Sequence, residues 1–573
     1  MSPEPSNRRA PSLRLWPALV LLALLWGLAY LPRLFAEPPL PVFMLAFLGP
    51  VACVLLMVIW WVAASRASRR EKLAGAGGLV LLFAGTLVLL HPTMRGFPVF
   101  GMVLPWGGTA FVLGLAATRW LKRFPRTAVG LAASALAFGF WTLVRMDGVW
   151  GDLHSERVWR WRQTAEERYL AQRTSAPERA AVVEAVAEAE WPGFRGPGRD
   201  AVVGGVVLGE DWEARPPREL WRTRVGPGWS SFAVAGRRLF TQEQRGELEA
   251  VVAYDAQTGA ELWAHEYRSR FFEAMGGVGP RATPTLAAGR LFALGAEGLL
   301  HRLDPATGEV VWQADLRQDA GREPPTWGFA SSPLVVDGLV IVHAGGEADR
   351  GVLAYGVDDG RLRWGAPAGG HSYSSPQLSR IAGQRSVALV TDAGLSLIHP
   401  ADGSVAWRHD WPHSSYRVLQ PLVVGGSTLL MTTDFSGTRR LDLRRENGGL
   451  VADERWTSRA MKSGFNDYVA HEGFLYGFDP NILACVDLET GERRWKGGRY
   501  GNGQLLLLPD ADQLLVLAET GDVVLLRPNP ERLEEMTRFK VLEGKTWNHP
   551  ALVGDRLYVR NAQEAVALAM PSG

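Results

Sequence analysis

The stretch AYDAQTGAELW, residues 253–263, decides the fold because it recurs along the chain. Close copies are RLDPATGEVVW (302–312) and CVDLETGERRW (485–495), and AYGVDDGRLRW (354–364) and LIHPADGSVAW (397–407) are variants. Each copy ends one strand, turns on Asp and Gly, and enters a second strand that finishes in Trp. Gly accepts the positive φ of the turn, and the Asp side chain bonds backbone amides. The repeat therefore predicts a series of similar antiparallel units.

The spacing of these copies predicts how the units are arranged. Aromatic residues end the recurring strand at positions 221, 263, 312, 364, 407, 456, 495 and 539. Their separations run from 39 to 52 residues, and each interval holds about four short strands, which is typical of a β-propeller. We therefore predict an all-β, eight-bladed propeller over residues 191–573, with the tryptophans packing one blade on the next.

The two ends of the array predict how the ring closes. The first Trp strand, ELWRTRV (219–225), has no blade before it, and the last segment, 556–570, has no Trp strand after it. We expect both to join one blade, which removes the exposed sheet edges of an open ring.

The first 147 residues differ from the rest and predict an α-helical membrane domain. Apolar runs occur at 13–31, 41–64, 74–90, 98–118 and 128–144, each near the length that crosses a ~30 Å hydrocarbon core. Basic residues gather at the N-terminus and in the second and fourth loops, whereas the other loops carry few. The positive-inside rule then places the N-terminus in the cytoplasm and the propeller outside, in the periplasm of a bacterial inner membrane.

Residues 148–190 are charged and rich in helix-forming side chains, so they predict a helical linker between the membrane domain and the propeller. The whole chain of 573 residues has a net charge of only +2, which does not favour nucleic acid as a partner. Its two cysteines, Cys53 and Cys485, do not suggest a disulfide framework. No Cys/His cluster has zinc spacing and no phosphate-binding Gly loop occurs, so the sequence predicts no metal site.

The loops that lead into the inner strands of a propeller meet around its central channel, and we call the surface they form the top face. Here they are rich in aromatic, basic and amide side chains, which ordinary turns do not need. A concave aromatic surface with a few polar groups predicts a ligand site. The loops are GPGWSSF (226–232), GGVGPRATP (276–284), TWGFASSP (326–333), AGGHSYSSP (368–376), SSYRVLQP (414–421), MKSGFNDYV (461–469), GRYGNGQ (498–504) and GKTWNHP (544–550).

The charges of these loops favour an anionic small ligand or an acidic protein partner. Five basic residues stand against one acid, Asp467, which gives the loops a net charge of +4. Asp467 follows Asn466, and an amide beside a carboxylate makes this pair the candidate for general-base or metal-binding work. The predicted ligand-binding residues are Trp229, Glu243, Arg245, Arg281, Trp327, Tyr373, Arg417, Lys462, Asn466, Arg499, Asn502, Lys545, Trp547, Asn548 and His549.

Two of these residues and one serine pair have alternative interpretations. Glu243 and Arg245 lie between two strands and either reach the rim of the channel or pair with each other. Ser331 and Ser332 could be nucleophiles, but SSP recurs at 374–376 without a histidine and acid in a triad-like relation. We therefore expect these serines to bond the backbone where the chain enters the inner strand.

The repeat resembles that of the pyrroloquinoline quinone (PQQ) dehydrogenases, through Ala253, Asp255, Thr258, Gly259 and Trp263. It is similar too to the repeat of a quinone-free outer-membrane assembly lipoprotein that shares their eight-bladed propeller. The opening segment of the propeller, WPGFRGPGRD, also looks like the start of PQQ-like propellers. Membrane spans before such a propeller are similar to those of membrane-bound quinoprotein glucose dehydrogenase.

The resemblance implies the fold more specifically than the activity, so two function hypotheses follow. The first is a membrane-anchored binding or scaffold module that acts through the top face and needs no cofactor. The second is a PQQ-dependent dehydrogenase, with calcium, that oxidises an alcohol or sugar and passes electrons to membrane quinone. The chain lacks the vicinal cysteine pair of several PQQ alcohol dehydrogenases and their long insertions between blades, which favours the first hypothesis.

Overall fold

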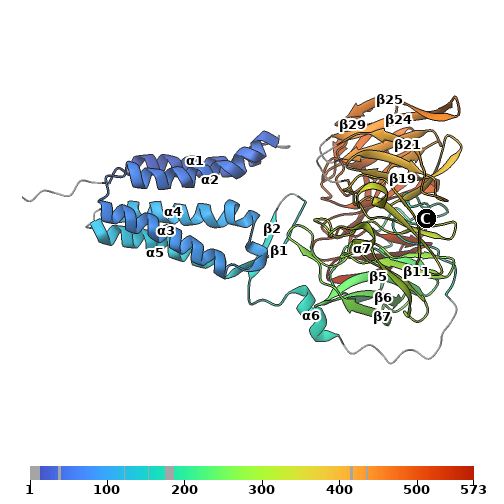
Figure 1. The fold of residues 1–573 in the computed structure, drawn as a ribbon, viewed down its shortest axis with the longest axis horizontal. Coiled ribbons are helices and arrows are strands. Elements are labelled where there is room, and N and C mark those ends of the chain that lie inside the picture. The colour runs from blue at the N-terminus through green and yellow to red at the C-terminus, as the bar shows by residue number, and fades with distance from the viewer. Residues whose placement is uncertain are drawn as a thin grey trace, which may run out of the picture. The chain divides into compact units, whose positions relative to one another are not determined.

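The computed structural model describes residues 13–35, 40–119, 121, 123–151, 154–173, 186–412, 417–433 and 436–573. The chain forms two compact units. The first comprises Met1–Gly148 and Ser155–Arg162, and the second comprises Val149–His154 and Gln163–Gly573. Helices build the first unit and β-sheets build the second, as Figure 1 shows.

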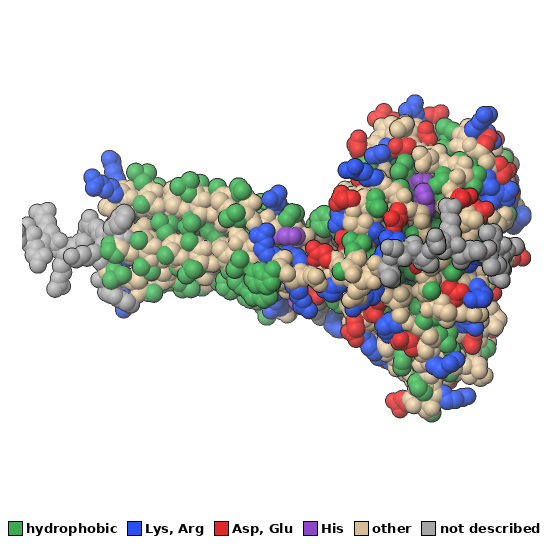
Figure 2. All heavy atoms as spheres, turned by 90° about the horizontal axis from the view of Figure 1, so that it is seen from below, with side chains coloured by type: hydrophobic (Ala, Val, Ile, Leu, Met, Phe, Trp, Pro, Cys, Tyr) green, Lys and Arg blue, Asp and Glu red, His purple; other side chains and the backbone are tan. Residues whose placement is uncertain are grey.

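In the described part of the first unit there are five long helices: α1 (Trp16–Tyr30), α2 (Leu40–Ala63), α3 (Arg69–Leu89), α4 (Leu104–Ala117) and α5 (Arg123–Thr142). Among the described residues, four segments are long and apolar enough to cross a membrane: Trp16–Leu34, Pro41–Ala63, Arg69–Leu89 and Val99–Ala117. Large hydrophobic side chains such as Leu81, Val88 and Leu136 are exposed on this unit, and Figure 2 shows apolar side chains along its length. Such a surface is stable in lipid and not in water.

Helix α5 occupies the position of the fifth expected span but is not one of those four segments. Arg126 lies near its start and makes this end of the helix less apolar. Arg126 is buried and forms an ion pair with Glu71 of α3, with 3.2 Å between Nη2 and Oε1. Glu71 also closes the capping box that begins α3 at Ser68. The ion pair thus links α5 to α3 within the helical unit.

Short elements occupy the region that was expected to be a helical linker. Strands β1 (Val144–Val149) and β2 (Ser155–Trp159) form a two-stranded sheet, and α6 (Ala165–Gln172) follows. A capping box of Thr164 and Glu167 begins α6. Residues 174–185, which complete this region, lie outside the described residues.

The second unit contains eight four-stranded antiparallel sheets, which are the predicted propeller blades. Blade 1 is β4 (Ala233–Ala235), β5 (Arg238–Arg245), β6 (Leu248–Asp255) and β7 (Glu261–Arg268). Blade 2 is β10 (Thr285–Ala287), β11 (Arg290–Leu294), β12 (Leu299–Leu303) and β13 (Val310–Asp315). Blade 3 is β14 (Leu334–Val336), β15 (Leu339–His343), β16 (Val352–Gly356) and β17 (Leu362–Ala366). Blade 4 is β18 (Gln377–Ile381), β19 (Gln384–Thr391), β20 (Gly394–Ile398) and β21 (Val405–Asp410).

The remaining blades repeat this order. Blade 5 is β22 (Leu422–Val424), β23 (Thr428–Thr433), β24 (Gly437–Glu446) and β25 (Gly449–Ser458). Blade 6 is β26 (Tyr468–His471), β27 (Phe474–Phe478), β28 (Leu483–Asp487) and β29 (Arg493–Gly497). Blade 7 is β30 (Gln504–Leu508), β31 (Gln513–Leu517), β32 (Asp522–Arg527) and β33 (Glu534–Lys540). Blade 8 is β34 (Ala551–Val553), β35 (Arg556–Arg560), β36 (Glu564–Ala569) and β3 (Arg218–Arg224).

Blade 8 confirms the predicted closure of the ring. Its strand order is β3-β36-β35-β34, so the first strand of the propeller is the outer edge of the blade that the C-terminus completes. The register pairs Arg218 with Ala569 and Arg224 with Glu564. The closing strand is thus held by backbone hydrogen bonds rather than by a covalent link.

The recurring Trp residues join neighbouring blades, as predicted. In six of them the indole Nε1 donates a hydrogen bond of 2.7–3.2 Å to a backbone carbonyl in the following blade: Trp221 to Ala256, Trp263 to Pro305, Trp312 to Val357, Trp364 to Pro400, Trp456 to Leu488 and Trp495 to Asn529. The turn glycine lies against the ring: a Cβ added to Gly308, whose φ is 74°, would lie 2.5 Å from Cε3 of Trp263. The Asp-Gly turn and the Trp of the preceding blade therefore form one contact.

Candidate functional site

The predicted top-face loops precede the innermost strands of the eight blades: β4, β10, β14, β18, β22, β26, β30 and β34. Neighbouring inner strands are in contact, as β10 is with β14, β26 with β30, and β34 with β4. The loops therefore approach one another around the channel. Of their residues, 414–416 lie outside the described residues.

A ring of polar residues lines the channel where the loops enter the inner strands. We call it the channel belt: Ser231, Thr283, Ser332, Ser375, Gln420, Asp467, Gln504 and His549. Each occupies the same place in its blade, and the next residue, a Pro, Tyr, Phe or Leu, lies at the start of the inner strand. All eight are buried.

Hydrogen bonds connect the channel belt from blade to blade. The amide of Ser231 donates to Oγ1 of Thr283 at 3.0 Å, and the amide of Thr283 donates to Oγ of Ser332 at 2.9 Å. The amide of Ser332 donates to Oγ of Ser375 at 2.8 Å. Oγ of Ser332 therefore bonds the backbone, as expected, whereas Oγ of Ser331 is buried without a hydrogen-bond partner, contrary to the expectation for that serine.

The segment that opens the propeller, residues 191–200, lies against the channel belt. Trp191 forms an isolated bridge with Val234 of β4. Arg199 donates from Nη1 to the carbonyl of Pro333 at 2.8 Å and from Nη2 to that of Ser332 at 3.0 Å. Both Arg199 and Arg195 are buried and have positive φ, a conformation that L residues other than Gly rarely adopt. This part of the chain therefore places two buried guanidinium groups among the inner strands.

Asp467, the predicted catalytic residue, lies in a buried ion cluster. Its Oδ1 is 3.0 Å from Nε of Arg195, and its Oδ2 is 2.5 Å from Nε2 of His549. Burial alone would raise the pKa of Asp467, but the charges of Arg195 and His549 outweigh it and hold that pKa below its usual value. The carboxylate is thus ionised, enclosed and engaged on both oxygens. The sequence analysis had found Asp467 and His549 but not Arg195, whose only signal was its position in WPGFRGPGRD.

The predicted asparagines act on the backbone. Nδ2 of Asn466 donates to the carbonyl of Pro480 at 2.7 Å, and Nδ2 of Asn548 donates to that of Ser230 at 2.8 Å. Both side chains are fully buried. Asn502 differs, because its backbone N–H donates to Oε2 of Glu519 at 3.1 Å. These contacts hold the loops in position.

An aromatic cluster forms on the top face from the loops that precede blades 1, 6 and 8. The rings of Trp229 and Trp547 lie 5.0 Å apart, and Phe465 lies 4.8 Å from Trp547. Nζ of Lys545 is 4.0 Å from the ring centre of Trp547 and 5.0 Å from that of Trp229, which is cation–π geometry. Four residues from three loops thus come together, and three of them, Trp229, Lys545 and Trp547, are predicted ligand-binding residues.

A second aromatic pair lies away from this cluster. Trp327 and Tyr373 stack with 5.0 Å between their centres, and the amide of Trp327 donates to the hydroxyl of Tyr373 at 3.0 Å. The amide of Tyr373 in turn donates to the carbonyl of Arg417, whose guanidinium lies over the ring of Trp411. Trp327, Tyr373 and Arg417 therefore form one connected group.

The remaining basic residues of the top face differ in their surroundings. Arg281 forms an ion pair with Glu273 at 3.0 Å, so it contributes little net charge. Arg499 is exposed. Lys462 contacts the buried carboxylate of Asp479, which also receives Nη2 of Arg493 at 2.8 Å and Nζ of Lys496 at 3.0 Å.

Three cations, Lys462, Arg493 and Lys496, surround the one carboxylate of Asp479. Side-chain exposure is 17% for Lys462, 34% for Arg493, 10% for Lys496 and 0% for Asp479. The sequence analysis missed Arg493 and Lys496 because they lie on the outer strand β29 and not in a loop. Their signal was the basic run RRWK after the Gly of the repeat.

Glu243 and Arg245 pair with each other inside β5. Nη2 of Arg245 is 2.7 Å from Oε1 of Glu243 and 2.8 Å from Oε2 of Glu261. The hydroxyl of Tyr169 on α6 donates to Glu243 at 2.7 Å. Burial acts to raise the pKa of Glu243, but Arg245 and its other partners lower it below the usual value. The pair therefore links α6 to blade 1, and α6 covers the pair.

Comparison with known proteins relates the repeats to one family. The family model of the outer membrane protein assembly factor BamB matches residues 212–319 and 249–497. BamB of Shewanella oneidensis is 26% identical over 380 residues, which are 61% of this chain and 88% of that protein.

Two solved structures are also similar to this chain. BamB from Moraxella catarrhalis has a TM-score of 0.43 at 14% identity and covers 62% of this chain and 100% of its own. The quinohemoprotein alcohol dehydrogenase from Comamonas testosteroni has a TM-score of 0.48 at 13% identity and covers 71% of this chain and 84% of its own.

Proposed function

The chain carries a propeller of PQQ-like repeats related to those of the outer membrane protein assembly factor BamB, and on this premise we propose that it is a membrane-anchored scaffold that binds protein partners. The repeats supply a rigid ring, and the four apolar segments supply the anchor. We place the contact surface on the top face, because its aromatic and basic side chains come from several loops at once.

One observation supports the choice of partner. Lys462, Arg493 and Lys496 gather around the carboxylate of Asp479 and are partly shielded from water, and basic side chains held this close favour an anionic partner. Arg and Lys side chains bind carboxylates with charge-assisted hydrogen bonds. An acidic segment of a partner protein would complete this cluster, with the aromatic residues of the top face as apolar contacts beside it.

The dehydrogenase hypothesis is supported less well by the same residues. A calcium ion needs several oxygen ligands, and Asp467 already has both oxygens engaged by Arg195 and His549. A cation beside Asp467 would also meet the guanidinium of Arg195, which repels it. The described top-face residues therefore do not fit a calcium–quinone site at the predicted catalytic position.

We place the propeller in the periplasm, anchored in the inner membrane. The alternating basic loops support this orientation, although the basic N-terminal residues lie outside the described residues. The orientation requires α5 to cross as a fifth span. It can be tested with a cysteine at exposed Asp402, because the native Cys53 and Cys485 are buried. A membrane-impermeant maleimide should label this site in cells with a permeable outer membrane, and labelling only after lysis would refute the orientation.

The partner chemistry can be tested with an acidic model peptide. We expect the full-length protein in detergent to bind hexaglutamate by calorimetry, and the double variant Arg493→Gln/Lys496→Gln to bind it at least about tenfold more weakly, because two phosphate- or carboxylate-binding cations are lost. Arg361→Gln/Arg363→Gln removes two exposed cations of blade 3 and is the matched control. Equal binding by the wild type and the first variant would exclude the cluster as the contact.

A second measurement separates the two functions. Adding PQQ and calcium to the purified protein should give no bound-quinone absorbance and no dye-linked oxidation of alcohols or aldoses. A stoichiometric quinone signal, together with turnover, would replace the scaffold proposal by the dehydrogenase.

A further inference from the structure

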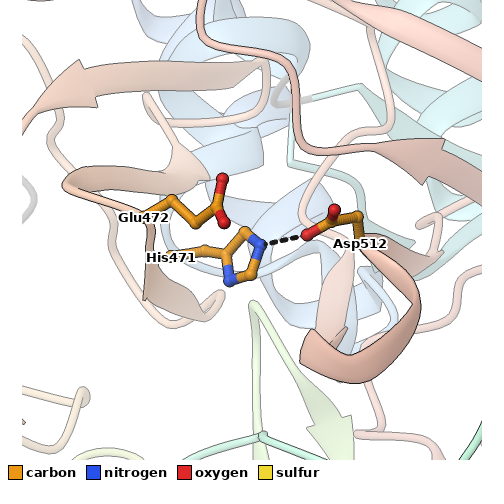
Figure 3. A group of neighbouring side chains, drawn as sticks. All are labelled: His471, Glu472 and Asp512. Atoms are coloured by element: carbon orange, nitrogen blue, oxygen red, sulfur yellow. Dashed lines mark hydrogen bonds and ion pairs between the residues drawn. The ribbon is translucent and has the colours of Figure 1, made fainter.

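Three donor side chains meet between blades 6 and 7, away from the residues discussed above. His471 is the last residue of β26, and Glu472 begins the turn to β27. Asp512 follows the short helix η5 (Pro509–Ala511) in the corresponding turn of blade 7. Figure 3 shows the imidazole of His471 with the carboxylates of Glu472 and Asp512 on either side of it.

The imidazole is an exception among the blades. The other seven inner strands all end in an apolar residue: Ala235, Ala287, Val336, Ile381, Val424, Leu508 and Val553. An apolar side chain at this place packs between neighbouring blades, so a histidine sacrifices apolar contact there. The repeat itself therefore gives no reason for His471.

The distances suit a shared ion. Nε2 of His471 is 2.7 Å from Oδ1 of Asp512, and one donor atom from each of the three residues lies within 4.8 Å of the others. A metal ion bound at about 2.1 Å from each donor needs donor separations of about 3–3.5 Å. The side chain of Asp512 is 62% exposed, so it can move by the small amount required.

The local charge also favours a cation. Among the described residues, no Lys or Arg forms an ion pair with Glu472 or Asp512. The matching turn of blade 3 behaves differently, because Asp337 forms an ion pair with Arg385 of the next blade at 2.6 Å. Blades 6 and 7 thus bring two carboxylates together without such an arginine.

We propose that His471, Glu472 and Asp512 bind one divalent transition-metal ion, such as Zn²⁺, that bridges blades 6 and 7. One imidazole nitrogen and two carboxylate oxygens form a donor set that suits zinc better than calcium or magnesium, which prefer oxygen ligands alone. Water completes the coordination on the exposed side. The sequence analysis predicted no metal because it looked for closely spaced Cys and His, whereas these ligands come from two blades.

Calorimetry of the full-length protein in detergent with zinc chloride tests the site. We expect one zinc per chain at the strongest site, and at least about tenfold weaker binding in His471→Ala and Asp512→Asn. His399→Ala is the matched histidine control, because His399 also lies at a strand end and bonds Gln384. Asp337→Asn is the matched carboxylate control. Both controls should bind zinc like the wild type.

Two further measurements keep the test decisive. X-ray absorption of the zinc-loaded protein should show one imidazole with oxygen ligands, and zinc should raise the Tm of the wild type but not that of His471→Ala. The Tm of that variant without zinc shows that it is folded. Unchanged affinity in His471→Ala, or no stoichiometric zinc in the wild type, would overturn the proposal.

Discussion

Asp467→Asn separates a structural carboxylate from a catalytic one. The change keeps the size of the side chain and removes the charge that pairs with Arg195 and His549. The side chains of Arg195 and Asp467 are only 3% and 2% exposed, so water cannot replace the lost partner. Removing one member of a buried ion pair costs about 3–5 kcal/mol, and we expect the propeller to lose stability of that order.

Urea unfolding of the full-length protein in detergent, followed by tryptophan fluorescence, measures this loss. With a slope of about 3 kcal/mol per molar urea, the midpoint of the propeller transition should move down by roughly 1–1.7 M. Asp359→Asn is the control, because Asp359 pairs with Arg363 on the surface and should leave the midpoint unchanged.

The pH dependence of folding stability is an independent test of the role of Asp467. The pKa of Asp467 is lowered in the folded protein, so the unfolded chain takes up its proton first as the pH falls. The stability from this group is present above the unfolded pKa of about 3.9 and is lost as the pH falls through the folded pKa. The Asn variant should lack this loss. A variant with wild-type stability at pH 7 would refute the structural role and return Asp467 to the functional candidates.

Two further predictions follow from local geometry. Gly308→Ala should lower Tm more than Gly338→Ala. The positive φ, 74° at Gly308 and 76° at Gly338, costs an alanine about 1–2 kcal/mol at either position, but only at Gly308 would the new Cβ also collide with Trp263. Equal Tm values for the two variants would contradict the contact between the blades. Burial lowers the pKa of His343 to about 4. The contribution of this residue to the free energy of unfolding is therefore fully present above the unfolded pKa of about 6.5. It falls as the pH is lowered, by roughly 2 kcal/mol at pH 5. His343→Asn should lack this part of the acid loss in unfolding experiments at pH 7 and pH 5, and an unchanged pH profile would show that His343 is not its source.

The residues of the candidate site were predicted unevenly. The loops that hold Trp229, Lys545 and Trp547 could be named from the sequence, because each directly precedes an inner strand of the repeat. Their meeting in one cluster follows from the ring. The partners of Asp467 could not be named in full, since Arg195 lies outside the repeats and enters the channel from the segment before the first blade.

Charge was the least predictable property of the top face. Counting loop residues gave a net charge of +4, but Arg281 is neutralised by Glu273, which lies outside the counted loops. A second group of cations surrounds Asp479, and two of its three members come from β29, outside the counted loops. A count along the chain cannot register such pairs, because ion pairs form across strands and blades.

The sequence alone determined the propeller, its eight blades and its closure, because the Asp-Gly turn and the Trp strand are local and recur. It also determined the apolar helices, since hydrophobic length is a property of consecutive residues. Only the tertiary structure decided that Asp467 is enclosed by Arg195 and His549, and that His471 and Glu472 meet Asp512 of the next blade. These contacts join residues far apart in the chain, and their distances depend on how the ring brings the blades together.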